Sequence, residues 1–312
     1  MGPRLANGYH ELETAFVLLD EPHDTMRILA MEGGQPGVSV RCDVPGIDCS
    51  NNTLTKAYAA YMKIHPLPLG FAVTLEKSVP HGAGLGGGSA NAAGLLQFFE
   101  YAAEERGLPM LGRARLTEVA ALVGADVPVF LERDAVAKTV DAGGQTGRPV
   151  YLATGIGEKL VPVENPFSGQ YLVLVCHDVH VSTAWAFAAL DEARQAGGRV
   201  AIWEGAEEGA GEGTAERGAE KNRLKANWNL TSKRHQDISF RSRNTALGND
   251  FEQVVFPAHP MLAALRDELI DAGAHTALLS GTGASVFGVF ADYATASAYV
   301  NTAEHRTFLC AL

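Results

Sequence analysis

The sequence predicts an α+β fold, in which helices and strands mix without the regular alternation of a doubly wound sheet. Strand-like segments alternate with helical ones along the chain, but hairpins intervene between them. The chain has 312 residues, which is enough for one large or two ordinary domains with substantial cores. Its hydrophobic share of 46% is typical of a globular protein rather than a disordered one.

In the first half of the chain, the elements follow one another closely. A helix over residues 54–62 has Asn51 or Asn52 as its candidate N-cap, because a side-chain oxygen there can accept the first free N–H groups. A glycine-rich turn at residues 33–37 joins two strand-like segments. The remaining elements expected here are strands at 25–29, 38–42 and 71–75, a loop into a strand or short helix at 11–20, and helices at 91–105 and 115–123.

The second half contains one segment of a different kind. Residues 196–247 are rich first in Glu, Gly and Ala and then in basic and polar residues, which predicts a disordered or loosely packed insertion. Asn249 or Asp250 is the candidate cap of the helix that follows. The other elements expected are hairpin strands at 134–140 and 149–152, a strand at 170–177, a helix at 261–272, a strand–glycine turn–strand over 277–290, and a helix at 294–304.

The composition limits the classes of function. A formal net charge of -11 argues against a nucleic-acid-binding surface, although local cations and N–H groups can still bind an anionic substrate. Cys42, Cys49, Cys176 and Cys310 lack the spacing of a metal site, so we expect reduced thiols and no metal ligands. Without an apolar run of about 18 residues or a leader sequence, we expect a cytoplasmic protein that does not enter a membrane. The oligomeric state is not specified by the sequence.

A glycine-rich stretch between a predicted strand and a predicted helix is the most specific indication of function. It consists of Pro80, His81, Gly82, Ala83, Gly84, Leu85, Gly86, Gly87, Gly88, Ser89 and Ala90. Glycine lets a ligand approach the backbone, and the helix aims its free N–H groups and positive dipole end back at the stretch. This predicts a pocket for a nucleotide phosphate. The lysine of a P-loop and the acid of a dinucleotide fingerprint are missing at their spacings, and a flexible loop is the alternative.

Several motifs resemble those of the GHMP kinase family. They are the glycine-rich stretch with its triple glycine, Gly8-Tyr9-His10-Glu11-Leu12-Glu13-Thr14, Gly124-Ala125-Asp126-Val127-Pro128-Val129-Phe130, and Ser280-Gly281-Thr282-Gly283-Ala284. The resemblance implies an N-terminal ATP-binding domain over residues 1–168 with the fold of ribosomal protein S5 domain 2. It also implies a ferredoxin-like C-terminal domain over residues 169–312, which contains the insertion at about 196–247, and an active site in the cleft between the domains. The combination of motifs is similar to a branch that phosphorylates a small cytidine-diphosphate substrate in non-mevalonate isoprenoid biosynthesis.

The resemblance implies roles for individual residues, with ATP and Mg2+ as cofactors. Asp126 would be the catalytic base that takes the proton of the substrate's 2-hydroxyl. An acid in an apolar septet is costly to bury unless it has partners or a function, and a turn aspartate is the alternative. The other implied contacts are Tyr9, His10, Thr183 and Phe187 with the substrate, Lys77 and Asn52 with ATP, and Gly281, Thr282 and Gly283 near the phosphates. For Lys77 a surface position is the alternative, and for His10 and Phe187 a place in the core.

The chain also departs from the family's pattern. A strand that reads approximately A-K-x-N-L, with a lysine that supports the catalytic aspartate, is expected ahead of Gly8 and is missing, so we expect a truncated start or a true loss. Ala90 stands where the family has a second serine, which predicts weaker Mg2+ or phosphate binding if that hydroxyl takes part. Two other functions stay open: another GHMP kinase, such as a sugar or homoserine kinase, and a nucleotide-binding protein that has lost catalysis.

Overall fold

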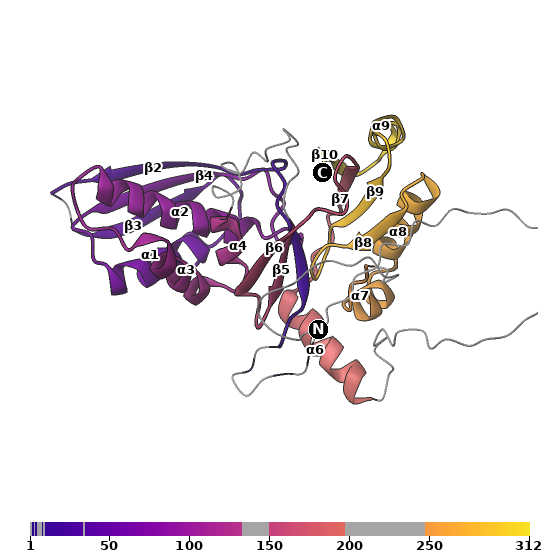
Figure 1. The fold of residues 1–312 in the computed structure, drawn as a ribbon, viewed down its shortest axis with the longest axis horizontal. Coiled ribbons are helices and arrows are strands. Elements are labelled where there is room, and N and C mark those ends of the chain that lie inside the picture. Colours follow the sequence, from indigo (N-terminus) through magenta and orange to yellow (C-terminus); the bar gives the residue numbers. More distant parts are fainter. Residues whose placement is uncertain are drawn as a thin grey trace, which may run out of the picture. The chain divides into compact units, whose positions relative to one another are not determined.

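Figure 1 shows the fold in a computed structural model, which describes residues 2, 4, 8, 10–33, 35–132, 150–196 and 247–312. The chain divides into two compact units, Met1–Gly169 with Cys310–Leu312 and Gln170–Leu309. Helices and strands occur in both units, so the α+β prediction is confirmed. The substrate contact of Tyr9, the strand at 134–140 and nearly all of the predicted insertion lie outside the described residues.

One sheet of the first unit is built around β4 (Gly70–Glu76), with β2 (Thr25–Met31) on one side and β3 (Gly37–Cys42) on the other. Strand β2 runs antiparallel to β4, whereas β3 runs parallel to it. Parallel neighbours need a crossover connection, and α1 (Thr53–Ile64) supplies it. The expected turn at residues 33–37 therefore joins two strands that pair with β4 rather than with each other.

The helices of the first unit cover one face of this sheet (Figure 1). In β4, buried Phe71 alternates with exposed Thr74, because only one face of the strand meets the helices. Helix α2 (Gly87–Glu104) places Phe99 against Phe71, with the ring centroids 4.7 Å apart. Helices α1 and α3 (Gly112–Val123) contribute further buried side chains to the core around these rings.

A capping box starts α1. The Asn52 Oδ1 accepts hydrogen bonds from the backbone N–H groups of Leu54 at 2.9 Å and Thr55 at 3.1 Å. In return, the Asn52 N–H donates to the Thr55 hydroxyl at 3.0 Å. The predicted N-cap at Asn52 is thus confirmed. Helix α2 is different, because it begins at Gly87 rather than at the predicted residue 91.

A second sheet of the first unit has the order β1-β5-β6. Strand β5 (Val150–Thr154) is central and runs antiparallel to β1 (Thr14–Val17) and to β6 (Lys159–Val163). The segment 11–20, expected to be a loop into a strand or short helix, therefore enters a strand. Within the described part of the chain, β6 is an element that the sequence patterns did not predict.

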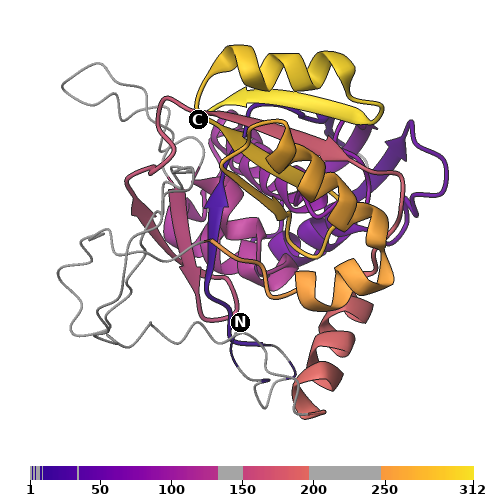
Figure 2. The ribbon, with the colours of Figure 1, turned by 90° about the vertical axis from the view of Figure 1, so that its right-hand side faces the viewer.

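The second unit contains one sheet with the order β10-β7-β9-β8 and helices on it. With the intervening helices, the strands follow the chain order and spatial order of a ferredoxin-like fold, as expected. In Figure 2, the orange helix α8 crosses in front of the strands, and the yellow helix α9 lies along the yellow strand at the top of the view. The element bounds are β7 (Tyr171–Cys176), α6 (Thr183–Gln195), α7 (Glu252–Ala258), α8 (Pro260–Asp271), β8 (Thr276–Leu279), β9 (Val286–Phe290), α9 (Tyr293–Thr302) and β10 (Arg306–Ala311).

The predicted cap of α7 is wrong. Its N-cap is Phe251, which makes no side-chain cap hydrogen bond, and Asp250 and Phe251 form the turn that leads into the helix. Instead, the Asn249 Oδ1 accepts a hydrogen bond from the Phe251 N–H at 2.9 Å. The rest of the Asn249 side chain reaches across to a loop described below.

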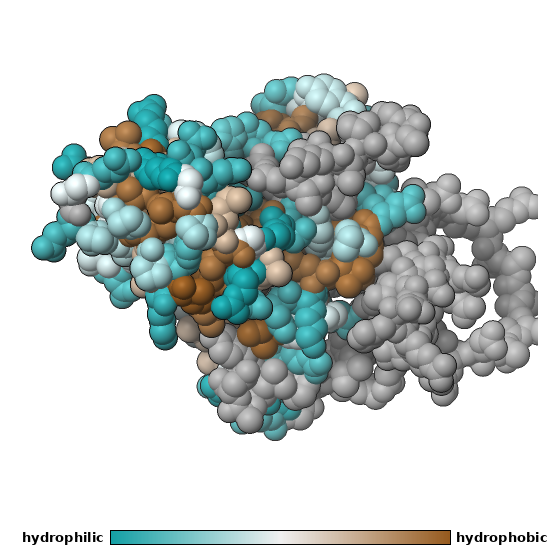
Figure 3. Space-filling model, turned by 60° about the vertical axis from the view of Figure 1, so that its left-hand side comes forward, coloured by the Kyte–Doolittle hydropathy of each residue, from teal (hydrophilic) through white to brown (hydrophobic). Residues whose placement is uncertain are grey.

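The surface mixes hydrophilic and hydrophobic side chains, and on the face in Figure 3 the hydrophobic ones form separate patches. Among the exposed apolar side chains are Leu29, 68% exposed, and Leu122, 71% exposed. None of the helices in the described ranges is long and apolar enough to cross a membrane.

Candidate active site

The glycine-rich loop between β4 and α2 ends in an uncapped helix N-terminus. Gly86, the N-cap residue of α2, has a φ of 66° in the left-handed region, which glycine adopts without strain. As a glycine, Gly86 has no side chain with which to cap the first turn of α2. The first N–H groups of this helix, together with its dipole, therefore form a site that favours an anion.

The triple glycine is explained by close packing at the start of α2. A Cβ atom on Gly87 would lie 2.8 Å from Val79 Cγ1 and 3.3 Å from Lys77 Nζ. A Cβ atom on Gly88 would lie 3.2 Å from the Thr53 hydroxyl at the start of α1. Because larger residues would push the helix away, the glycines let the first turn of α2 sit directly on the segment that leads into the loop.

The Asn52 side chain lies next to this packing but is engaged in capping α1. Besides the two bonds accepted by its oxygen, its Nδ2 donates to the Asp48 carbonyl at 3.0 Å. A nucleotide contact through this side chain would compete with those hydrogen bonds. The assignment of Asn52 to ATP binding stays a prediction.

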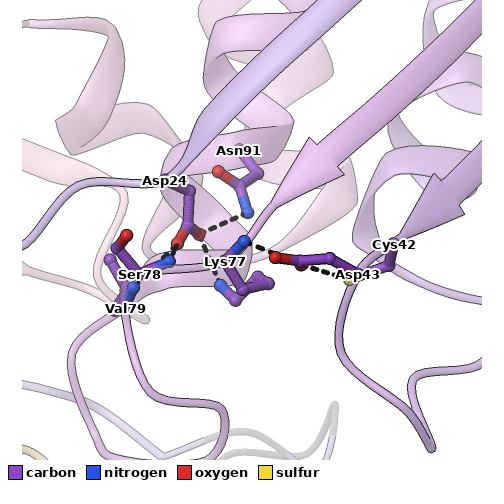
Figure 4. A network of polar contacts seen from close by, with 7 residues as sticks. All are labelled: Asp24, Cys42, Asp43, Lys77, Ser78, Val79 and Asn91. Carbon is purple, nitrogen blue, oxygen red and sulfur yellow. Dashed lines mark hydrogen bonds and ion pairs between the residues drawn. The ribbon is translucent and has the colours of Figure 1, made fainter.

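Lys77 is not the solvated surface lysine considered as an alternative. Its side chain is 7% exposed, and its ammonium group forms an ion pair with Asp24, whose side chain is 2% exposed (Figure 4). Its backbone N–H donates to Asp43 Oδ1 at 2.9 Å. Asp24 was not predicted from the sequence as a functional residue. The only local signal was an acidic residue directly before a strand, which many surface loops also contain.

Asp126 lies at the N-terminus of the short helix α4 (Val127–Leu131), where Val127 and Val129 are fully buried. Burial raises the pKa of the Asp126 carboxyl above its usual value. Within the described ranges, no hydrogen bond or ion pair to this carboxylate is present. Such an acid is a stronger base than an exposed aspartate when it is ionised.

Phe130 joins the Asp126 segment to the glycine-rich loop. A Cβ atom on Gly86 would lie 2.9 Å from Cζ of the Phe130 ring, so the ring packs directly on the loop backbone. Phe130 is one helical turn beyond Asp126 in the same septet. The structure therefore brings together two of the motifs that the sequence analysis identified separately.

The turn between β5 and β6 supports the Asp126 segment from another direction. A Cβ atom on Gly157 would lie 3.5 Å from both the Cβ and the carbonyl oxygen of Ala125. The carbonyl of Gly155 in the same turn accepts a hydrogen bond from the Leu12 N–H at 2.7 Å. This places the segment after His10, which is itself 6% exposed, beside the turn that contacts Ala125.

In the second unit, a glycine loop connects β8 and β9. Asn249 Nδ2 donates to the carbonyl groups of Leu279 at 2.9 Å and Gly281 at 2.6 Å. Glu252 Oε1 accepts from the Leu279 N–H at 2.8 Å, and the Gly283 N–H donates to the Ser280 carbonyl at 2.8 Å. Asn249 and Glu252, from the segment that leads into α7, thus fix the start of the loop.

The two predicted substrate contacts of the second unit lie on α6. The Thr183 hydroxyl is 3.2 Å from the Thr282 hydroxyl, so α6 and the loop between β8 and β9 are joined. Phe187 is half-buried, and its ring packs edge-on against that of Phe251 with centroids 4.9 Å apart. The structure therefore places Thr183 beside Thr282, one of the three residues predicted to lie near the phosphates.

The described residues contain no group of three or more His, Cys, Asp or Glu side chains arranged to hold a metal ion. All four cysteines are free thiols, of which Cys176 and Cys310 are buried. The first unit combines an N-terminus of α2 that favours an anion with the buried Asp126 carboxyl, whose pKa is raised.

Two family models match the chain. The model described as "GHMP kinases N terminal domain" matches residues 52–133, and the model described as "GHMP kinases C terminal" matches residues 233–303. A protein of Nitratidesulfovibrio vulgaris (strain DP4), named 4-diphosphocytidyl-2-C-methyl-D-erythritol kinase, is 40% identical over 92% of this chain and 84% of its own length. A protein of the same name from Solidesulfovibrio magneticus is 36% identical over 95% of this chain and 86% of its own.

Solved structures share the fold. A crystal structure of a 4-(cytidine 5'-diphospho)-2C-methyl-D-erythritol kinase has a TM-score of 0.62 at 22% identity and covers 98% of this chain and 92% of that one. The homoserine kinase of Cytophaga hutchinsonii has a TM-score of 0.54 at 15% identity, covering 95% and 88%. At these identities the likeness concerns the fold alone.

Proposed function

The chain belongs to the GHMP kinases, and we propose that it transfers the γ-phosphoryl group of ATP to the 2-hydroxyl of 4-diphosphocytidyl-2-C-methyl-D-erythritol. This reaction is a step of non-mevalonate isoprenoid biosynthesis. The observation that carries the proposal is the similarity, over nearly the whole chain, to relatives that bear this kinase's name. In the proposal, the first unit is the ATP-binding domain, the second is the C-terminal domain of the family, and the acceptor is a small molecule.

The ATP phosphates bind at the loop from Pro80 to Ala90. The N–H groups of the first turn of α2 point at the phosphates, and the helix dipole favours their negative charge. Because the Lys77 ammonium is paired with Asp24, it contributes through the position of the loop rather than as a free positive charge. Positioning and electrostatic stabilisation are the main sources of catalysis in phosphoryl transfer.

Mg2+ is part of the proposal as the companion of the nucleotide. It commonly takes only one or two ligands from a protein and the rest from phosphates and water, which fits the absence of a three-residue metal cluster among the described residues. Ser89 offers a hydroxyl at the first turn of α2, whereas Ala90 offers none. When bound, the ion neutralises negative charge that develops on the phosphate oxygens.

Asp126 accepts the proton of the 2-hydroxyl, or orients that oxygen toward the phosphate. Its raised pKa moves it toward the range in which a carboxylate is an effective general base. The contact between Phe130 and Gly86 fixes the helix that carries it against the loop that holds the phosphates. In the proposal, Tyr9, His10, Thr183 and Phe187 contact the cytosine end of the acceptor, and Gly281, Thr282 and Gly283 contact the transferred phosphate.

Asp126→Asn tests this assignment. The substitution keeps the size of the side chain but removes its basicity, so turnover of the cytidyl substrate falls by about 10²-fold or more. Affinity for MgATP, measured by calorimetry, changes little because the phosphates bind elsewhere. Glu118→Gln is the matched control, since that carboxylate is 62% exposed on α3, and it leaves turnover unchanged.

Wild-type turnover by Asp126→Asn would remove the residue from the mechanism. The same assay with homoserine and mevalonate as acceptors tests the branch, because preference for either over the cytidyl substrate would contradict the proposed acceptor. Wild-type protein that binds MgATP but phosphorylates none of these acceptors would instead be a nucleotide-binding relative.

A further inference from the structure

Asp24 is a buried carboxylate that lies outside the residues assigned to catalysis and to substrate binding. It lies directly before β2, and its side chain is 2% exposed. Oδ1 accepts hydrogen bonds from the backbone N–H groups of Ser78 and Val79, both at 2.8 Å. Oδ2 accepts from Asn91 Nδ2 at 2.8 Å and from the Lys77 ammonium group (Figure 4).

These donors come from the two ends of the glycine-rich loop. Lys77, Ser78 and Val79 lead from β4 into the loop, and Asn91 lies in the second turn of α2, just after it. A single carboxylate from a third segment therefore connects the chain before the loop with the helix after it. Figure 4 shows this arrangement, with the Asp24 carboxylate between Asn91 on one side and Ser78 and Lys77 on the other.

The charge of the carboxylate is maintained in this position. Burial alone would raise the pKa of Asp24, but the hydrogen bonds from Lys77, Val79 and Asn91 and the positive charge of Lys77 outweigh it and hold the pKa below its usual value. All the donors thus face an ionised acceptor, and hydrogen bonds of this kind are about twice as strong as neutral ones.

The same contacts reach the anion site itself. The Lys77 ammonium lies 3.3 Å from the position that a Cβ of Gly87 would take, so the ion pair sits beneath the first turn of α2. A shift of the Asp24 carboxylate would consequently change the direction in which the first N–H groups of this helix point. Hydrogen-bond donors fixed in advance bind a ligand at a lower entropic cost.

We propose that Asp24 is a positioning residue for phosphate binding, which connects the two ends of the glycine-rich loop so that the N–H groups of α2 converge on the nucleotide phosphates. The inference rests on the proposed function, because it takes the loop as the phosphate site. It differs from a purely structural role in one respect. A structural carboxylate affects folding alone, whereas Asp24 affects the affinity for phosphates separately from the affinity for the rest of the nucleotide.

Two variants and one control test the proposal. Asp24→Asn keeps the shape of the side chain but cannot accept from all the donors. Asn91→Ala removes the connection to α2 while the ion pair between Asp24 and Lys77 stays in place, so its fold is at less risk. Glu100→Gln is the matched control, because that carboxylate on α2 accepts from the Tyr61 hydroxyl at 2.5 Å and the Leu111 and Gly112 N–H groups at 3.1 and 2.9 Å.

For each variant, the affinity for MgATP is measured by calorimetry and the affinity for adenosine by competition. The melting temperature of each variant is measured as well. We expect Asp24→Asn and Asn91→Ala to bind MgATP about tenfold or more weakly, the effect of losing one hydrogen bond to a charged group. Adenosine, which lacks phosphates, binds as it does to the wild type. Glu100→Gln lowers the melting temperature but leaves both affinities unchanged.

The outcomes separate this proposal from the proposed function. If folded Asn91→Ala binds MgATP with wild-type affinity, the positioning role is refuted, whether or not Asp24→Asn folds. It is refuted equally if adenosine affinity falls as much as MgATP affinity, since the loss would then not be specific to phosphates. A wild-type protein that binds MgATP but does not phosphorylate the cytidyl substrate contradicts the proposed reaction and leaves the positioning role supported.

Discussion

Gly86→Ala tests most directly how the glycine-rich loop packs against the Asp126 segment. Gly86 has a φ of 66°, and a Cβ atom there would lie 2.9 Å from Cζ and 3.0 Å from Cε2 of Phe130. The added methyl group therefore meets two separate penalties. One is backbone strain in the left-handed region, and the other is overlap with the ring.

The two penalties can be separated by a control substitution. An L-residue in the left-handed region costs about 1–2 kcal/mol. Overpacking adds about 1–3 kcal/mol, because the ring or the backbone has to move. Gly107 is the matched control, since its φ is 63° and a Cβ atom there would have no neighbour within 4 Å. We expect Gly107→Ala to lose about 1–2 kcal/mol of unfolding free energy and Gly86→Ala about 2–5 kcal/mol.

The assay has to report on the first unit alone, because a chain with two units does not unfold in a single step. Tryptophan fluorescence is unsuitable, because none of the three tryptophans of the sequence falls within Met1–Gly169 or Cys310–Leu312, the ranges of the first unit. Urea titration with peptide-resolved hydrogen exchange over α2 measures the required unfolding free energy. The same variants are assayed for MgATP affinity, which we expect only Gly86→Ala to lower.

A second substitution identifies the ring as the cause. In Gly86→Ala with Phe130→Leu, the smaller side chain relieves the overlap but not the strain, so the two changes together cost about 1–3 kcal/mol less than their sum. Equal destabilisation by Gly86→Ala and Gly107→Ala, or additivity in the double variant, would refute the contact as the structural link between the loop and Asp126.

Two further predictions concern the second unit. Asn249→Asp places a carboxylate against the carbonyl groups of Leu279 and Gly281. Amide hydrogen exchange in the loop at 280–285 therefore becomes faster, and the increase is larger than in Asn249→Ala. Unchanged exchange in both variants would show that the Asn249 side chain does not hold the loop. Phe187→Ala weakens binding of the cytidyl substrate by about 1–3 kcal/mol through lost stacking and leaves MgATP affinity unchanged. Phe187→Leu keeps an apolar contact with Phe251, and if it binds the substrate as tightly as the wild type, stacking by this ring is not the reason for recognition.

Local features of the sequence were predicted well where the interaction is itself local. The residue types alone indicated an N-cap at Asn51 or Asn52, because the hydrogen bonds of the cap at Asn52 join residues only two or three positions apart. The start of α2 was placed too late, because glycine is a poor helix former and packing against Val79 and Thr53 overrides that preference. The parallel pairing of β3 with β4 was also not predicted, since it depends on a partner beyond a helix.

Asp24 shows the limit of sequence reasoning about the site. Its donors Lys77 and Asn91 are 53 and 67 positions away, and no pattern in the neighbourhood of Asp24 indicates them. Asp126 was singled out because its septet is unusual in being apolar around an acid, and the family resemblance added its role. The catalytic and substrate-binding assignments themselves stay predictions, and that of Tyr9 lies outside the described residues.

The pairing of Lys77 with Asp24 has a consequence for the way in which the nucleotide arrives. With that lysine neutralised and a net charge of -11 on the chain, the long-range field of the protein opposes an approaching polyanion. The N–H groups at the start of α2 attract phosphate only at contact distance, because the field of a helix terminus falls off within a turn. Nucleotide is thus captured on collision rather than steered from afar, and added salt, which screens the repulsion between distant charges, favours the encounter.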